Sequence, residues 1–595
     1  MSTSTGRRTL GLLCLAVILG AAAPMSDSPV ADAAMRGDRE TLRTLLRQGA
    51  DVNAAQPDGM TALHWAAKRD DAETARMLIF AGAALESVTR IGHFTPLLLA
   101  SRAGNAAAAV ALLEAGANAK AITSTGGATP LHFAAGQGNT DVVRVLLEHG
   151  AGIDARESAW GQTPLMWAAA HDRVAALKLL IATGADVATT SRIEDIAERE
   201  RADRAAAQAR NRRMAALRAA DRPPPSRDSA QKATPDSTRK VAADSAQKAP
   251  DDSASAKKEP EPLSYGQLVG TKGGLTPLLF AARQGNVESV LALLEAGADI
   301  DQVSAGDQTS PLLIATLNGH FDLARLLLER GADPNLVSAA GAAPLYAAIN
   351  VQWSAKSLYP QPTAHKQQQT TYLELMKSLL DAGAQPNVRL AKHLWYMSFN
   401  FDLLDVNTAG ATPFWRAAYA TDVEAMRLLI AHGADPNIPT EKPPERRRRG
   451  DDDQPVAEGE DLSGLPPIPV GGPAVWPIHA ASGVGYGEGY AANAHRHVPD
   501  GWSPAVKYLI EELGADVNAR DHNGYNPMHH AAARGDNTLI QYLVDKGTDV
   551  TAISRRGQTT ADMANGPVQR VSPFLETVAL LEKLGSKNNH KCKSC

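Results

Sequence analysis

The sequence has little cysteine, few aromatic residues and almost no net charge. Its 595 residues include three cysteines, too few for a disulfide-rich scaffold or for zinc modules built on four thiolates. Aromatic residues make up 5%, which favours small helices packed through alanine and leucine over all-β cores. With 60 basic and 65 acidic residues the net charge is −5, so the whole chain has no strong field for nucleic acid or membranes. Any electrostatic preference must be local.

Long apolar runs are also missing, apart from one near the start of the chain. Arg7 and Arg8 precede an apolar stretch over residues 10–23 that ends in small residues, a pattern typical of a secretory signal peptide. No other stretch approaches the 18 apolar residues of a spanning helix. We therefore expect residues 1–23 to be a cleaved signal peptide and the mature protein to be soluble, without a membrane anchor, and periplasmic or secreted. The arginine pair leaves Sec and twin-arginine export both open.

Strong catalytic and nucleotide-binding signatures are absent from the sequence. It contains no Gly-x-Gly-x-x-Gly after a strand, no Walker lysine and no His-Glu-x-x-His. The pairs around His495 and His529 lack carboxylates or thiols at a ligand spacing. We therefore expect no enzyme activity, no cofactor and no metal site.

A unit of about 34 residues repeats along the chain. Similar tetrapeptides begin at Thr61, Thr95, Thr129 and Thr163, each 34 residues after the last. In each unit an alanine-rich helix, a break and a second apolar stripe lead to a glycine. Threonine caps the first helix. A proline at the first position of that helix removes only a backbone N–H that would be unpaired in any case. The glycine ends the second helix. The sequence thus predicts two short helices per unit, joined to the next unit by an extended finger.

These residues resemble the ankyrin repeat. The resemblance implies an all-α repeat solenoid of about twelve helix-turn-helix units, which stack because one unit cannot bury its own apolar face. The motif also contains His64, His132, His479 and His529 at one position, where the family uses histidine for local backbone hydrogen bonds. Aromatic residues at the next position, such as Trp65, Phe133, Trp167 and Phe280, are expected in the core between repeats.

Insertions divide the predicted solenoid into two blocks. We expect one block at 28–187, then a charged helix over 193–220 and a Pro/Ser/Ala/Lys/Asp-rich disordered tether within 188–270. The second block covers 271–585, with insertions between the helices of a unit at 351–371 and 483–502 and in fingers at 388–410 and 438–472. We expect residues 586–595 to form a polar, flexible tail.

The tail carries the only two cysteines of the expected mature chain. Cys592 and Cys595 are separated by two residues and lie beside lysines, which favour the thiolate. A disulfide, a metal site with His590, a haem site or no role all remain open. The alternative to a scaffold is accordingly a redox or electron-transfer accessory protein that uses this pair.

The resemblance also places a binding groove at the ends of the first helices. Two positions per unit face it, and among twenty such positions five are basic and none is acidic. We therefore predict a non-catalytic scaffold that binds an acidic protein surface, but not nucleic acid, through this groove and the fingers. The oligomeric state stays open. The predicted groove residues are Lys68, Arg69, Arg102, His171, Arg283 and Arg534.

Overall fold

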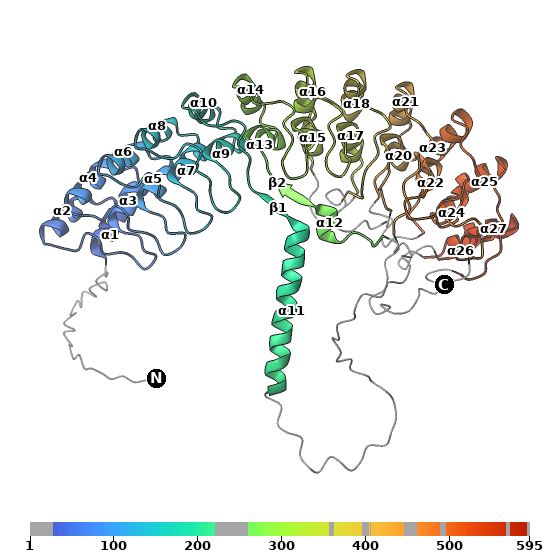
Figure 1. Ribbon diagram of the computed structural model, residues 1–595, viewed down its shortest axis with the longest axis horizontal. Coiled ribbons are helices and arrows are strands. Elements are labelled where there is room, and N and C mark those ends of the chain that lie inside the picture. Colours follow the sequence, from blue (N-terminus) through green and yellow to red (C-terminus); the bar gives the residue numbers. More distant parts are fainter. Residues whose placement is uncertain are drawn as a thin grey trace, which may run out of the picture. The chain divides into compact units, whose positions relative to one another are not determined.

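The computed structural model describes residues 28–220, 260–355, 362–394, 404, 406–444, 461–487, 495–566 and 572–591 (Figure 1). The expected signal peptide at 1–23 lies outside the described residues, as do Cys592, Cys595 and the greater part of the expected tether. Within the described residues, no helix is both long enough and apolar enough to span a membrane.

The chain divides into two compact units, with the division inside the fifth helix pair. Unit one contains the described residues up to Ala159 together with Lys178–Ala185, and unit two contains Trp160–Leu177 and the described residues from Asp186 onward. Four helix pairs lie wholly within unit one: α1 (Pro29–Arg36) and α2 (Arg39–Arg47), α3 (Ala62–Lys68) and α4 (Ala72–Phe80), α5 (Pro96–Ala103) and α6 (Ala106–Glu114), α7 (Pro130–Gln137) and α8 (Thr140–Glu148).

The fifth pair and seven further pairs complete the repeat array, so the described residues contain the predicted twelve pairs. The fifth is α9 (Pro164–Ala170) and α10 (Val174–Ala182). The others are α13 (Pro277–Gln284) and α14 (Val287–Glu295), α15 (Pro311–Leu317) and α16 (Phe321–Glu329), α17 (Pro344–Gln352) and α18 (Tyr372–Asp381), α20 (Pro413–Tyr419) and α21 (Val423–Ala431), α22 (Pro477–Ser482) and α23 (Trp502–Lys507), α24 (Pro527–Ala532) and α25 (Asn537–Asp545), α26 (Thr560–Asn565) and α27 (Leu575–Lys583).

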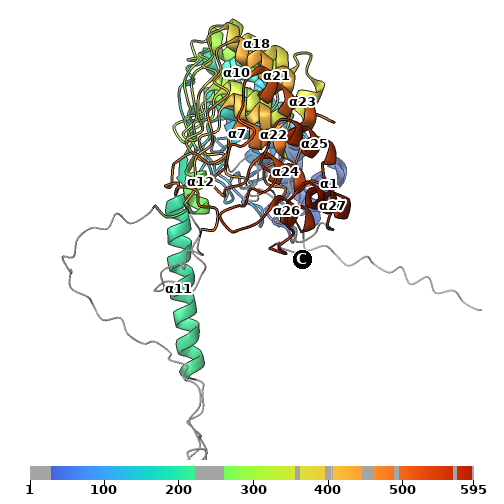
Figure 2. The same ribbon diagram turned by 90° about the vertical axis from the view of Figure 1, so that its right-hand side faces the viewer.

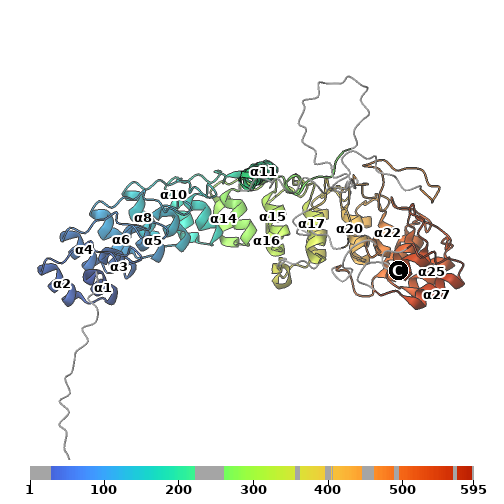
Figure 3. The ribbon, with the colours of Figure 1, turned by 90° about the horizontal axis from the view of Figure 1, so that it is seen from below.

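Within each unit, each pair packs its first helix on the first helix of the next pair. In unit two this row runs α9, α13, α15, α17, α20, α22, α24 and α26, and Figure 3 shows α15, α17, α20 and α22 side by side. Leucines and alanines of both helices fill the space between neighbours; Leu131 and Leu146, for example, are fully buried. The all-α repeat solenoid expected from the sequence is thus the observed fold.

The caps of the helices follow the predicted chemistry. Thr95 Oγ1 accepts the N–H of Leu98, Pro96 begins helix α5, and Gly104 ends it with φ +76°, a conformation that favours glycine. The motif histidines also have the predicted role. His64 Nδ1 accepts the N–H of Thr61 (3.1 Å), so its neutral ring carries the proton on Nε2 and donates to the Phe94 carbonyl (3.0 Å) of the next finger. His132, His479 and His529 accept the same N–H bond.

Fingers are closed by a recurring backbone hydrogen bond, and three insertions lie beyond it. In an uninterrupted finger the N–H of Thr123 donates to the Ala128 carbonyl (3.1 Å). After the fifth pair, Ser191 donates to Leu275 (2.9 Å), so the long insertion extends from a finger tip. Corresponding bonds close the two fingers that carry the other insertions. In one finger the N–H of Leu390 donates to the Ala411 carbonyl, and in the other the N–H of Thr440 donates to the Val475 carbonyl.

The described part of the long insertion starts as a two-stranded extension of its finger. Strands β1 (Ile193–Asp195) and β2 (Thr271–Gly273) pair antiparallel, with Glu194 opposite Lys272. The charged helix expected at 193–220 is α11 (Ile196–Ala220), and its first turns hold α12 (Tyr265–Val269) through Glu200, which accepts from Ser264 Oγ (2.8 Å). Figure 2 shows the rest of α11 extending away from the helix pairs of unit two.

The helices on either side of this insertion meet as ordinary neighbours. Between the second and third pairs, Asn105 Nδ2 donates to the Ala67 carbonyl across 38 residues (2.8 Å). Asn286 Nδ2 makes the same bond to the Ala169 carbonyl across 117 residues (2.8 Å). The structure therefore differs from the predicted division at 188–270: α9 packs directly on α13, and the inserted residues leave and re-enter at one finger tip.

The predicted free tail also differs from the structure over its first six residues. Ser586 is buried, and its Oγ accepts the N–H of Ala561 (3.2 Å). Asn589 donates its N–H to Asp562 Oδ1 (2.7 Å). These residues pair with polar groups at the start of α26, where a following finger would otherwise lie.

Cleavage within the insertion should not separate the two sides. We expect a protein carrying an engineered protease site between residues 221 and 259 to elute as one species from a native sizing column after complete cutting, because α9 and α13 keep their contact. Two separated fragments would show that this contact does not hold the chain together. Denaturing electrophoresis of the same fractions confirms that cutting is complete.

Candidate functional site

The predicted groove residues of unit one lie at the ends of first helices, and two of them lie above aromatic rings. Lys68 Nζ lies 4.8 Å from the centre of the Trp65 ring, and the Arg102 guanidinium lies 5.1 Å from the Phe94 ring. Trp65 itself is half-buried, with its Nε1–H donated to Gln56 (2.8 Å). Cation–π contacts of this kind hold a basic side chain in place while leaving its charge in solvent.

This finding corrects the expectation that the aromatic position belongs to the core. Phe280 is buried at 4% exposure, but Trp65, Phe133 and Trp167 are only half-buried. In two repeats the ring at this position supports a basic residue at the helix end, Trp65 under Lys68 and Phe280 under Arg283. Periodicity alone shows that the position recurs and does not reveal which side of the helix it faces.

The three predicted groove residues of unit one differ from several arginines on its second helices, because those arginines form ion pairs and the groove residues form none with the described residues. Lys68, Arg69 and Arg102 are exposed, and within the described part of the chain none forms an ion pair. Arg69 donates to a backbone carbonyl, that of Met35 (3.3 Å). In contrast, three arginines of α2 and α4 form ion pairs with carboxylates: Arg39 with Asp71, Arg43 with Glu73, and Arg76 with Glu114. We call Lys68, Arg69 and Arg102 the basic surface.

Apolar side chains stand exposed on the fingers of the same unit. Ile91 is 86% exposed and Ile122 is 61% exposed, each on a finger between two helix pairs. Val88 on the first of these fingers is also exposed. Single exposed apolar residues are common, but here they recur at fingers of adjacent repeats. The sequence motif gave no reason to single them out.

The predicted groove residues of unit two have unequal surroundings. His171 is exposed, and its Nδ1 lies 2.8 Å from the Trp167 carbonyl. Arg283 is half-buried 5.2 Å from the Phe280 ring, and burial lowers its pKa from the ordinary value. Both occupy the expected helix ends, but they do not form a continuous basic surface comparable with that of unit one.

The prediction that Arg534 lines the groove is wrong, because this side chain is buried and not available to a partner. Its side chain is 7% exposed and forms an ion pair with Asp536 at 3.0 Å. The guanidinium lies 3.8 Å from the Trp502 ring centre, and its Nε–H donates to the Ser482 carbonyl (3.1 Å). Trp502 ends the insertion between α22 and α23, so the insertion covers the position that other repeats leave open.

Alanine substitution should destabilise the protein more at the buried Arg534 than at the exposed Arg102. Arg534→Ala removes packing and leaves Asp536 without its partner, so we expect it to lower the free energy of unfolding by about 2 to 3 kcal/mol. Arg102→Ala should change that free energy by less than about 0.5 kcal/mol. Urea denaturation of both variants measures the difference, and similar small effects would show that Arg534 is also a surface residue.

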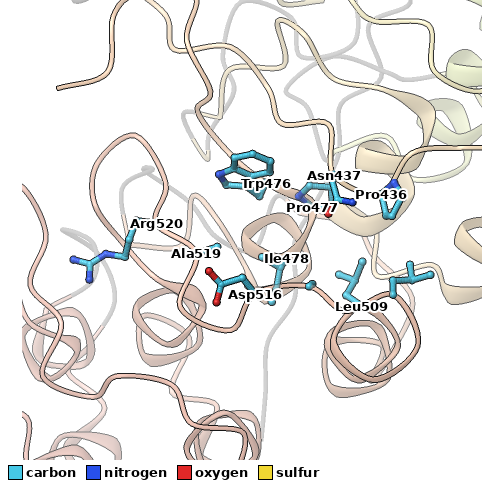
Figure 4. A pocket seen from close by; sticks show the side chains of 11 residues that line it. Pro436, Asn437, Trp476, Pro477, Ile478, Leu509, Asp516, Ala519 and Arg520 are labelled. Carbon is cyan, nitrogen blue, oxygen red and sulfur yellow. The ribbon is translucent and has the colours of Figure 1, made fainter. Parts of the chain in front are cut away.

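An apolar pocket lies beside a distorted second helix in unit two. Its volume is about 340 Å³, and Figure 4 shows Trp476, Ile478 and Leu509 around it, with the Arg520 guanidinium directed away from the others. After α23 the chain forms a π-turn, Tyr508–Glu512. The eleven other second helices have a leucine four residues before the glycine that follows them, but here Leu509 and Gly514 are five apart. One extra residue accounts for the π-turn and could have been recognised from the sequence.

Buried histidines in the last repeats accompany a buried carboxylate. Asp521 and His530 are fully buried, with 3.2 Å between Oδ2 and Nε2, and Asp521 Oδ1 accepts the N–H of Tyr525. Burial alone would raise the pKa of Asp521, but its hydrogen bond to His530 and the electrostatic effect of the neighbouring histidines lower it below its ordinary value. No group of three histidine, cysteine or acidic side chains in the described ranges is placed to hold a metal.

Stability should fall with acid because the motif histidines are buried as neutral rings. Burial lowers the pKa of His479 to about 4 although Asp521 opposes the shift, while an unfolded histidine has a pKa of about 6.5. Between pH 6.5 and 4 the unfolded chain binds more protons, so unfolding becomes easier by up to about 1.4 kcal/mol per pH unit for such a histidine. This contribution is fully present above pH 6.5.

We expect His479→Gln to flatten the fall in urea midpoint between pH 7 and pH 4.5. The matched control is His149→Gln on an exposed histidine at the end of α8, which should keep the parent's slope. Identical slopes in all three proteins would contradict the assignment of acid sensitivity to the buried ring.

Comparison with known proteins supports the repeat assignment directly. Models described as ankyrin repeats match residues 30–123, 111–191, 263–338, 409–441 and 491–544, together more than half of the chain. Protein phosphatase 1 regulatory subunit 12A of Rattus norvegicus is 32% identical over 95 residues, which are 16% of this chain and 8% of that protein. Protein phosphatase 1 regulatory subunit 27 of Mus musculus is 33% identical over 72 residues, 12% of this chain and 46% of that protein.

The chain thus spans less than a tenth of the first of these relatives and under half of the second. Among solved structures, the human ASB11 ankyrin repeat domain matches with a TM-score of 0.34 and 25% identity, over 52% of this chain and 99% of that one.

Proposed function

Because the chain belongs to the ankyrin-repeat family, we propose that it is an exported, non-catalytic scaffold that binds an acidic protein surface through unit one. The family match and relatives named as regulatory subunits support binding of a protein partner. The expected signal peptide, with Arg7 and Arg8 before an apolar run, supports a periplasmic or secreted location.

The observation that carries this proposal is the basic surface. Lys68, Arg69 and Arg102 point their charges into solvent from adjacent repeats, and two of them rest on aromatic rings that restrict their motion. A partner carboxylate can therefore pair with them without first breaking an internal ion pair and with little ordering of the side chains. The exposed Ile91 and Ile122 of the fingers add apolar contact area beside charge recognition.

Charge reversal tests the proposal. We expect Lys68→Glu, Arg69→Glu and Arg102→Glu together to slow association with the native partner at least tenfold and to remove its salt dependence, because exposed charges steer encounter. The partner is captured by crosslinking in the intact source cells, and association rates are then measured on a sensor at several salt concentrations. Circular dichroism checks that the variant folds.

The matched control reverses three exposed cations of the same unit that lie elsewhere, Arg47, Lys120 and Arg144. It changes the net charge by the same amount, so a loss of association in both triple variants would indicate a nonspecific charge effect. An unchanged rate in the basic-surface variant would contradict the proposed site.

A further inference from the structure

Two insertions of unit two, distant in sequence, form one pocket. The first follows α17 and includes the short helix η2 (Ala364–Gln367), and the second precedes α23. Their described residues line an open cavity of about 710 Å³ together with neighbouring helices, and its wall includes His365, Lys366, His495 and Arg496. Ordinary repeats join their helices by a short turn at this place, so the pocket exists only because both insertions are present.

The pocket has a firm aromatic wall. Asp422 Oδ2 accepts hydrogen bonds from Trp353 Nε1 (2.9 Å) and Tyr372 Oη (2.7 Å), which fixes both rings at the cavity. On the opposite insertion, His495 is 8% exposed and stacks on Tyr419 with 4.3 Å between ring centres. The pocket is thus built by buried contacts that hold its side chains before any ligand arrives.

The charged side chains that line the pocket are all basic. Lys366 and Arg496 are exposed at the cavity, and none of the residues that line it is acidic. Two nearby carboxylates are already used: Asp422 holds the aromatic wall, and Asp322 accepts the N–H groups of Gln369 and Thr370. A third, the exposed Asp500, lies close enough to act on His497 electrostatically. Burial lowers the pKa of His365 and His495, so both rings are neutral at pH 7 and each offers one N–H donor.

Three buried polar atoms of the wall lack a hydrogen-bond partner among the described residues. They are Nδ1 of His365, Oγ1 of Thr370 and Nε2 of His495. Two of these atoms still lie close to acceptors, Thr370 Oγ1 to the Asp322 carboxylate and the His495 ring to the Tyr419 carbonyl, whereas no acceptor of the described ranges lies beside His365 Nδ1. A buried polar group is rarely left unpaired, so His365 Nδ1 at the cavity indicates a polar ligand.

We propose that this pocket binds a small organic anion: a ring that packs on Trp353 and Tyr372 and carries a carboxylate or phosphate held by Lys366 and Arg496. The volume lies within the range of small-molecule sites, and a bare inorganic ion would leave the aromatic wall unused. A carboxylate or a phosphate accepts from both cations and from the neutral histidines. This site is separate from the basic surface of unit one.

Paired probes test the charge requirement. The full chain is titrated calorimetrically at low salt with anions and with their neutral counterparts. Glucuronate and glucose 6-phosphate are compared with neutral glucose, and benzoate is compared with neutral benzamide. We expect at least one anion to bind with a Kd below 1 mM and its neutral counterpart to bind at least tenfold more weakly. Glucuronate and glucose 6-phosphate distinguish a carboxylate from a phosphate ligand. If no anion binds more tightly than its neutral counterpart, the proposal is wrong.

Variants locate the binding. Lys366→Ala and Arg496→Ala should each weaken the anion at least tenfold, whereas Arg330→Ala, an exposed arginine at the end of α16, should leave it unchanged. Unchanged binding in both pocket variants would place the ligand elsewhere and overturn the proposal. The triple charge reversal in unit one should retain the probe, so failure of this site and failure of the scaffold proposal give different results.

Discussion

Stacking of first helix upon first helix is the constraint on which the rest of this structure depends. A pair of helices six to ten residues long cannot bury an apolar face alone, so each repeat is stable only against its neighbours. The polar contacts between repeats serve the same end. An asparagine before a second helix donates to the carbonyl at the end of the preceding first helix, as Asn105 does to Ala67, and buried histidines tie a first helix to the next finger.

This constraint decides where the chain tolerates extra residues. Insertions occur beyond the hydrogen bond that closes a finger or between the two helices of a repeat, and at neither place do they separate stacked helices. The bond from Asn286 to Ala169 shows the consequence, since it restores the ordinary junction after the longest insertion. Within each unit the stacked repeats support the chain, and the features that distinguish it lie at helix ends, fingers and insertions.

Much of the fold follows from the sequence because its signals are local. Threonine, proline and glycine at 34-residue spacing predict the helix pairs and their caps, and the histidine of the same motif predicts a backbone bond. Long-range packing is different. Nothing near Arg534 in the sequence shows that Trp502 and Tyr486 cover it, and nothing near Ser191 shows that Leu275 closes its finger. The basic surface was predictable from register, whereas the pocket needed two insertions brought together across more than a hundred residues.

The central claim is that the repeat stack continues across the long insertion. Hydrogen exchange of the intact protein, followed by mass spectrometry, measures it directly, because amides in a helix that is covered by the next repeat exchange slowly. The account predicts that peptides from α9 and α13 are protected as strongly as those from α15 and α17, and far more strongly than those from the terminal helices α1 and α27. Protection of α9 and α13 as weak as that of the terminal helices would show that the stack ends at the insertion.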